Sequence, residues 1–339
     1  MPIIDQTDPR AMARYEDFIA HSPHGVLYQS IHWAHVKENW TPDYITVEED
    51  GKIIAALSII SVHNPEGSFS YAVRGPVCDV YDIDLVKRLV EEAKPVLEKR
   101  KSFLLRMDPE ARYDEDLIRL YEGAGFHVRS RSCPIHSFSN PRLNMVVYLD
   151  QDPEDLMMTF EGRFRSKIRR AFKKGVEIDI YQKDDPEFEE VFDRFYEMTG
   201  IMAERQEIGY RPKDYYHRLF EAYENTYLYE ASHEGDHLAS CIVINYNDKS
   251  LYLYAASTNE KRNLNASTAM NWKAIEDATR AGYKEYDMTG VWSLDEDDGL
   301  YRFKKKFTGE RGIREFVGEF DWILDQTAYD TFMDKQRKK

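Results

Sequence analysis

One order of predicted elements occurs twice in this chain: a strand, a turn, two strands, a helix, a strand and a short helix. Alternating apolar residues indicate the strands, and apolar residues three and four apart indicate the helices. The first copy comprises strands at 44–47, 53–62, 68–73 and 103–107, a helix that begins at Asp82 or Asp84, and a short helix at 116–122. The second copy comprises strands at 226–231, 238–246, 250–257 and 284–288, and helices at 266–280 and 299–307. A repeat of pattern on this scale predicts two tandem units of one fold.

The repeated order resembles the acetyltransferase (GNAT) type of unit, whose Leu-Tyr-x-x-x-Gly-Phe element is visible at Leu120–Phe126. We therefore expect an α/β (α+β) protein with two tandem acetyltransferase-like domains and mixed sheets. No low-complexity linker separates the halves. We assign the first domain to residues 1–145 plus about 316–339 and the second to residues 146–315.

The distribution of charge is more informative than the total. A net charge of −15 argues against a general polyanion-binding protein. However, residues 163–174 hold seven basic residues and no acid, and residues 302–314 hold six basic residues and one acid. Two basic patches on an acidic chain fit a local polyanion site such as an RNA backbone or a diphosphate. Either patch taken alone is equally consistent with a solvated helix face.

Acetyltransferase-type units suggest acyl transfer to an amine. The loop that would bind the pyrophosphate of coenzyme A shows whether this cofactor is the acyl donor. The pyrophosphate of coenzyme A needs a glycine-rich loop that lets backbone N–H groups approach the phosphates. In the second copy this loop reads Arg262–Ser267 (RNLNAS), with Asn265 at the place of the glycine, and in the first copy the segment Cys78–Asp82 is acidic. The sequence therefore disfavours coenzyme A, and we expect no bound cofactor.

Motifs for metal binding and covalent catalysis are missing from the sequence. The three cysteines form no CxxC, the ten histidines show no metal spacing, and there is no Gly-x-Ser-x-Gly, Walker loop or His-Glu-x-x-His. Direct attack by a substrate amine on an activated ester fits best, with the enzyme supplying positioning and oxyanion stabilisation. The N-terminus lacks the features of a signal peptide, and no run approaches the roughly 18 apolar residues of a membrane span. We expect a cytoplasmic protein.

Several short segments, in order along the chain, resemble the FemABX family and most of all its short, FemX-type members. They are Arg165–Arg170 (RSKIRR), Met202–Arg205 (MAER), Arg211-Pro212 with Tyr215, Leu253–Ser257 (LYAAS) and the helix with Phe303-Lys304. Such proteins have two tandem acetyltransferase-like domains and move an amino acid from aminoacyl-tRNA to the ε-amine of lysine in the peptidoglycan stem peptide. The short type uses UDP-MurNAc-pentapeptide and typically transfers alanine. The coiled-coil arm of the staphylococcal relatives is missing here.

The resemblance implies which residues bind the acceptor, UDP-MurNAc-pentapeptide. They are Lys37, Asn39, Trp40, Phe103, Arg211, Tyr215, Tyr254 and Glu319. Lys37 and Arg211 would hold the diphosphate through charge-assisted hydrogen bonds. Relatives can carry Tyr at the position of Phe103, so a hydroxyl contact is in doubt there.

The resemblance places the reaction centre at Phe303, Lys304 and Asp108. Lys304 would stabilise the developing oxyanion or the tRNA end, and Asp108 would contact the peptide or its amine. The attacking amine must lose a proton, because free lysine has a pKa of about 10.4. A carboxylate of normal pKa is a weak base, so we assign Asp108 to positioning first. The terminal adenosine hydroxyl is at least as plausible as the group that takes the proton.

The resemblance assigns the tRNA acceptor arm to the two basic stretches. The residues implied are Arg165, Lys167, Arg169, Arg170, Lys305 and Lys306. We expect alanyl-tRNA as the donor and a monomeric enzyme. Lys305 and Lys306 either attract RNA or are merely solvated.

Two other functions remain open at this stage. One is a coenzyme A-dependent N-acyltransferase, and the other is a non-catalytic nucleotide-sugar or RNA-binding protein. Individual residues also have structural interpretations: Arg211 as half of a surface ion pair, Tyr215 and Tyr254 as core, and Asp108 as the cap of the turn before Pro109. The sequence leaves open which amino acid is donated and whether a lipid-linked acceptor is also used.

Overall fold

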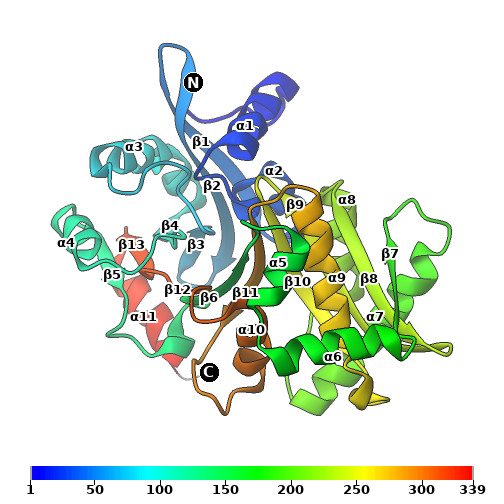
Figure 1. The fold of residues 1–339 in the computed structure, drawn as a ribbon. Coiled ribbons are helices and arrows are strands. Elements are labelled where there is room, and N and C mark those ends of the chain that lie inside the picture. The colour runs from blue at the N-terminus through cyan, green and yellow to red at the C-terminus, as the bar shows by residue number, and fades with distance from the viewer. Residues whose placement is uncertain (1, 338–339) are drawn as a thin grey trace. The chain divides into compact units, whose positions relative to one another are not determined.

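The computed structural model describes residues 2–337, which form two compact units. Unit 1 consists of the chain up to Leu143 and from Glu315 onward, and unit 2 consists of Asn144–Arg314. Each unit contains one mixed β-sheet with helices packed on it (Figure 1).

The sheet of unit 1 has six strands in the order β1-β2-β3-β4-β13-β5. Their bounds are β1 Thr41–Glu49, β2 Lys52–Asn64, β3 Gly67–Ala72, β4 Ser102–Met107, β5 His127–Arg129 and β13 Glu319–Ile323. Only the β3–β4 pair is parallel, and the other neighbours run antiparallel. β13, the last strand along the chain, therefore lies between β4 and β5, which occur more than 180 residues earlier in the sequence.

The crossover helix α3 (Ile83–Arg100) covers the sheet of unit 1 and builds its core. Asp82 caps it by accepting a hydrogen bond from the Leu85 amide at 3.0 Å, which satisfies one of the free N–H groups of the first turn. Its buried stripe includes Val86, Leu89, Val90, Ala93 and Leu97, which pack on the inner residues of the strands. The remaining helices of this unit are α1 Pro9–His21, α2 Ile31–Val36, α4 Glu115–Gly123 and α11 Gln326–Arg337, with 3-10 turns at Leu27–Gln29 and Ile135–Ser137.

The sheet of unit 2 has seven strands in the order β12-β6-β11-β10-β9-β8-β7. Their bounds are β6 Leu143–Tyr148, β7 Glu177–Tyr181, β8 Thr226–His233, β9 Asp236–Tyr246, β10 Lys249–Ser257, β11 Glu285–Val291 and β12 Ile313–Glu315. The helices are α5 Pro153–Thr159, α6 Gly162–Lys173, α7 Phe188–Gln206, α8 Lys213–Ala222, α9 Ala266–Arg280 and α10 Gly299–Thr308, with a 3-10 turn at Arg262–Leu264. The β10–β11 pair is parallel, and β7–β8, β8–β9 and β9–β10 are antiparallel.

The predicted order of the repeat is confirmed, and the structure shows that the strand directions repeat as well. The series β1, β2, β3, α3, β4, α4 in unit 1 matches β8, β9, β10, α9, β11, α10 in unit 2, and in each the third and fourth strands are the parallel pair. The predicted fold class is likewise confirmed, and the longest described helix, α7, has 19 residues and leaves no coiled-coil arm in residues 2–337. The second copy's fourth strand continues to Val291 rather than ending at residue 288.

The two parallel strand pairs differ in how far the pairing extends toward the ends of the strands. In unit 1, β3 and β4 stay paired through Ala72 and Met107, at the ends of both strands. In unit 2, the pairing of β10 with β11 stops at Leu251 and Asp287, although β10 continues to Ser257 and β11 to Val291. The unpaired ends of β10 and β11 open a gap in the sheet of unit 2.

No helix within residues 2–337 combines the length and the apolar character required to cross a lipid bilayer.

Gly318 provides a test of how β13 enters the sheet. It adopts φ +124°, and a Cβ added there would overlap the carbonyl oxygen of Arg129 on the neighbouring strand. We expect Gly318→Ala to lower the free energy of unfolding by about 2–5 kcal/mol, because backbone strain and overlap with a fixed backbone atom add together. Urea unfolding followed by circular dichroism measures this loss.

The matched control is Gly51→Ala in the β1–β2 turn of the same unit. Gly51 also has a positive φ, +74°, but no atom lies within 4 Å of an added Cβ. Its loss should be limited to the backbone cost of about 1–2 kcal/mol. Equal losses for the two variants would contradict the close approach at Gly318.

Candidate active site

The side chain of Lys304 in unit 2 is only 3% exposed, which is unusual for a lysine. It lies on α10, which starts after Asp298, whose carboxylate caps the helix through the Tyr301 amide at 2.8 Å. The ammonium donates to the Gly290 carbonyl oxygen at 2.9 Å and to Thr289 Oγ1 at 3.3 Å. Both acceptors belong to the unpaired end of β11.

Burial lowers the pKa of Lys304 to about 8, because removal from water disfavours its charged form, while Asp287 and Asp298 act in the opposite direction. At neutral pH the ammonium therefore remains mostly protonated. Two of its three N–H groups are used by β11, so one donor is left for a ligand. A buried, oriented cation of this kind can stabilise negative charge that develops on a substrate oxygen.

Lys304 lines a cavity of about 750 Å³ in unit 2. The gap between β10 and β11 forms one side of it, and α10 and the end of α7 contribute to the rest. The lining residues are Met202, Gln206, Ile208, Tyr252, Leu253, Tyr254, Ala255, Ala256, Ser257, Ser267, Met270, Thr289, Gly290, Asp298, Gly299, Leu300, Phe303 and Lys304. Thr289 holds φ +63°, which is strained for a β-branched residue, and this conformation lies directly at the lysine.

A second cavity of about 430 Å³ adjoins the first and contains Arg211. The two cavities share the wall formed by Met202, Ile208, Tyr254 and Ala255. The Tyr254 hydroxyl donates to the Tyr215 hydroxyl at 3.1 Å, and the Arg211 guanidinium lies 5.3 Å from the centre of the Tyr215 ring. Within unit 2 the structure therefore brings Arg211, Tyr215 and Tyr254 together next to the cavity of Lys304 and Phe303.

Lys37, Asn39 and Trp40 lie in unit 1, in the turn between α2 and β1. The Trp40 amide donates to the Lys37 carbonyl at 2.8 Å, which closes the turn that follows the end of α2 at Val36. The Lys37 ammonium lies 5.4 Å from the centre of the Trp33 ring, and Asn39 is exposed.

Phe103 is part of the aromatic core of unit 1. It is 1% exposed on β4, and its ring lies 5.3 Å from the ring of Phe332 on α11. Phe332 in turn packs on Phe69 at 5.2 Å, and Phe69 meets Trp40 edge to face at 6.0 Å. The rings of Phe332 and Phe69 thus connect Phe103 to Trp40.

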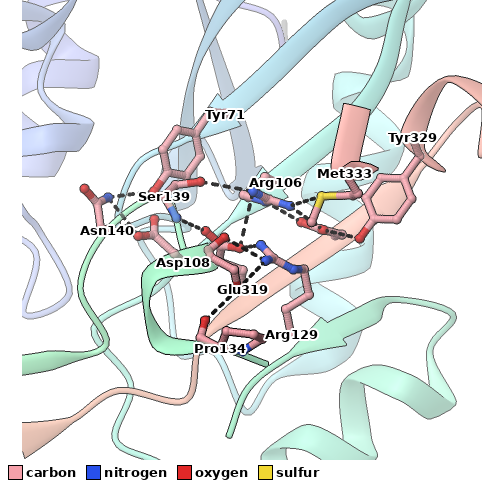
Figure 2. A network of polar contacts seen from close by, with 12 residues as sticks. Tyr71, Arg106, Asp108, Arg129, Pro134, Ser139, Asn140, Glu319, Tyr329 and Met333 are labelled. Atoms are coloured by element: carbon pink, nitrogen blue, oxygen red, sulfur yellow. Dashed lines mark hydrogen bonds and ion pairs between the residues drawn. The ribbon is translucent and has the colours of Figure 1, made fainter. Parts of the chain in front are cut away.

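Asp108 follows β4 and is 2% exposed. Its carboxylate accepts from the Arg74 amide at 2.6 Å and from Asn140 Nδ2 at 3.0 Å, and it pairs with the Arg74 guanidinium at 3.3 Å. The same Asn140 amide also donates to the Tyr71 hydroxyl at 2.6 Å (Figure 2). Burial raises the pKa of Asp108, against the lowering effect of Arg74 and Asn140. The partners come from elsewhere in the chain, so Asp108 is more than the cap of a local turn.

Glu319 begins β13 and is 1% exposed. It accepts from the Ser139 amide at 2.5 Å, pairs with Arg106 at 3.3 Å and bonds with Arg129. Burial raises the pKa of Glu319, while the two arginines lower it. Both carboxylate oxygens of Glu319 thus have partners inside the protein (Figure 2), and its predicted contact with the acceptor stays a prediction.

Arg106 connects this network and was not found by sequence reasoning. It is fully buried on β4, donates to both oxygens of Asp321 at 2.7 Å and donates to Ser139 Oγ at 3.0 Å. Tyr329 of α11 also donates to Asp321, at 2.9 Å (Figure 2). The only signal in the sequence is a charged residue at an inward position of an apolar strand.

The basic residues predicted to meet tRNA fall into two groups. Arg165 on α6 donates to the carbonyl oxygens of Met158 and Phe160, and Lys305 pairs with Glu296 at 2.5 Å and with Glu310 at 2.7 Å. These two cations have partners within the protein, and their contact with tRNA stays a prediction.

The second group consists of exposed cations: Lys167, Arg169 and Arg170 on α6, and Lys306 on α10. Partial burial lowers the pKa of Lys306, and the positive charges of Lys167 and Arg302 lower it further. Lys167 and Arg302 are thus close enough to Lys306 to disfavour its charge, as expected of a surface that an anionic partner would neutralise.

Metal coordination has no candidate in the part of the chain that is described: no three His, Cys, Asp or Glu side chains of residues 2–337 are grouped to hold an ion.

The network around Arg106 predicts a stability effect. Arg106→Met leaves Glu319 and Asp321 buried with less compensating charge, and we expect a loss of about 3–5 kcal/mol in the free energy of unfolding. Chemical denaturation measures it. Arg119→Met is the matched control, because Arg119 forms its ion pairs with Glu115 and Asp116 at the surface of the same unit and should change little. Similar effects for both variants would contradict a structural role of the buried pairs.

Comparisons with known proteins agree on one family. The model of the FemAB family matches residues 11–232 and 226–333. The UDP-N-acetylmuramoylpentapeptide-lysine N(6)-alanyltransferase of Weissella viridescens is 35% identical over 338 residues, covering 97% of this chain and 98% of that protein. A lipid II:glycine glycyltransferase of Staphylococcus haemolyticus (strain JCSC1435) is 24% identical over 393 residues, covering 93% and 92%.

A crystal structure of FemX has the same fold. It superposes with a TM-score of 0.86 at 22% identity and covers 98% of this chain and 100% of its own. Together with the match over most of the sequence, this similarity identifies the chain as a member of the FemAB family.

Proposed function

We propose that this chain transfers L-alanine from alanyl-tRNA to the ε-amino group of lysine in UDP-MurNAc-pentapeptide, which starts the interpeptide bridge of peptidoglycan. The enzyme is then an aminoacyltransferase, in line with the names of its relatives. The similarity to the Weissella alanyltransferase over nearly the full length of both proteins supports the acceptor and the amino acid.

The observation that carries this proposal is the buried ammonium of Lys304 in a cavity of unit 2. When an amine attacks an ester, the carbonyl oxygen gains negative charge, and a donor that is already oriented and desolvated stabilises that charge. Gly290 and Thr289 hold the ammonium in place, so its remaining N–H group can face the carbonyl oxygen of the donor. Phe303 lines the same cavity and offers an aromatic ring for the terminal base of the tRNA.

The proposed transfer needs no reagent other than the two substrates. The lysine Nε forms an amide bond with the alanyl carbonyl carbon, and the ester bond to the terminal ribose breaks. One proton passes from the attacking amine to the ribose oxygen that leaves. Asp108 has both carboxylate oxygens engaged by Arg74 and Asn140, which favours a positioning role over that of the base.

The acceptor needs cations for its diphosphate, and unit 2 offers Arg211 beside Tyr215 and Tyr254. Unit 1 offers Lys37, with Trp40 in the same turn. The donor tRNA needs a positive surface, for which the exposed Lys306, Lys167 and Arg170 are better suited than Arg165 or Lys305.

The pH dependence of transfer tests the role of Lys304. Because the group acts as a cation and has its pKa lowered to about 8, the charged form is present below that pH and is lost above it. The acceptor amine also loses its proton as the pH rises, which affects every variant alike, so Lys304→Arg, whose guanidinium stays charged, serves as the reference. We expect kcat/KM for alanyl-tRNA of the wild-type enzyme, divided by that of Lys304→Arg, to fall as the pH rises through about 8.

Lys304→Met separates catalysis from binding in the same assay. Calorimetry should show that it still binds UDP-MurNAc-pentapeptide, while transfer falls by about 100-fold or more, the effect of losing one oxyanion donor. Normal turnover by Lys304→Met, or a ratio of wild type to Lys304→Arg that stays constant through a pH of about 8, would remove Lys304 from the reaction.

A further inference from the structure

The cavity of Lys304 contains one more charged side chain. Among the described residues that line it, Asp298 and Lys304 are the only charged ones, and they have opposite signs. The remaining wall is largely apolar, with Met202, Ile208 and Leu300 among its residues. An apolar cavity with one cation and one anion fits a small ligand that presents both an electron-rich oxygen and a positive group.

We infer that Asp298 binds the α-ammonium group of the donor aminoacyl ester. This inference rests on the proposed function and names the part of the donor that the enzyme recognises. The α-ammonium is attached to the carbon next to the ester carbonyl. When that carbonyl lies against Lys304, the donor ammonium lies close to a second positive charge. An anion in the same cavity removes this repulsion.

The carboxylate of Asp298 is oriented for this contact. Its Oδ1 accepts from the Tyr301 amide at 2.8 Å, which fixes the side chain at the start of α10. Within residues 2–337 no donor bonds to its Oδ2. Asp298 is also close enough to Lys304 to favour the charged form of that lysine.

Both side chains line the same cavity, one at the start of α10 and the other about one to two turns further along the helix. The lysine side chain leans back toward the N-terminus of its helix and thus toward Asp298. Asp298 and Lys304 can therefore contact neighbouring groups of one aminoacyl ester.

The other acid near Lys304 is already used by the protein. Asp287 is buried on β11, where it accepts from Asn144 Nδ2 at 3.1 Å and from the Thr289 amide at 2.7 Å. It does not belong to the lining of the cavity. Asp298 is thus the carboxylate that a ligand in this cavity can reach.

A donor that lacks the α-ammonium tests the inference. L-lactyl-tRNA replaces the amine of alanyl-tRNA with a hydroxyl group of similar size and keeps the ester. We expect the wild-type enzyme to prefer alanyl-tRNA in kcat/KM by about 10- to 100-fold, the effect of one charge-assisted hydrogen bond. At a pH well below the pKa of Lys304, where this lysine stays charged in both enzymes, Asp298→Asn should lower the rate with alanyl-tRNA by a similar factor and leave the rate with lactyl-tRNA the same.

Asparagine is chosen because it is as good a helix cap as aspartate, so α10 keeps its start and only the charge is lost. Asp297→Asn is the matched control: it removes an exposed acid from the same loop outside the cavity and should keep the wild-type preference. Asp298→Ser, a second neutral cap, should reproduce the result of Asp298→Asn.

Two results would overturn the inference. One is equal use of both donors by the wild-type enzyme, a measurement that needs no variant. The other is an equal loss with both donors in Asp298→Asn, which would leave Asp298 with a capping role alone. Failure of the proposed function looks different, because the wild-type enzyme would then transfer from neither tRNA.

Discussion

The candidate active site of this protein depends on one hydrogen-bonded cation, the ammonium of Lys304. A lysine is almost never buried without partners, because removing its charge from water is costly. Here the carbonyl of Gly290 and the hydroxyl of Thr289 compensate part of that cost, and both belong to the end of β11 that β10 leaves unpaired. The early end of strand pairing therefore creates the cavity and also supplies the acceptors that keep a cation in it.

The two copies of the repeat have diverged at this point. In unit 1 the equivalent parallel pair is closed to the strand ends, and the copy of α10, which is α4, carries no lysine run. Unit 1 instead contains buried arginines and carboxylates. Arg106, Arg129 and Glu319 hold the segment around Ser139, and the next residue, Asn140, holds the carboxylate of Asp108. A charge network of this kind fixes geometry more than it adds stability.

Local patterns in the sequence predicted the elements of the repeat. They did not predict β6 and β13, two strands that lie outside the repeat and complete the sheets. The periodicity of α3 and α9 and the caps at Asp82 and Asp298 are visible in the sequence. The positions of β13 and β6 are not, because each is short and pairs with strands that lie far away in the chain. The lysine run indicated a candidate reaction centre only through the family resemblance. In the structure Lys304 is buried, Lys305 is paired with an acid and Lys306 is exposed. This difference arises because only one face of α10 is covered by the rest of the unit, and the lysine run alone does not reveal which face that is.

The proposed function depends above all on the acyl donor, aminoacyl-tRNA in place of acetyl-coenzyme A. Asn265, the residue at the place of the expected glycine, adopts φ +57°, a conformation that glycine also favours, and its side chain bonds to Asn263 in its own loop. The direct measurement is mass spectrometry of UDP-MurNAc-pentapeptide after incubation with the protein and, in parallel, alanyl-, seryl- and glycyl-tRNA or acetyl-coenzyme A. The account predicts that alanyl-tRNA adds one alanine to the lysine Nε and that acetyl-coenzyme A adds nothing. An acetylated acceptor, or no product with any charged tRNA, would contradict it.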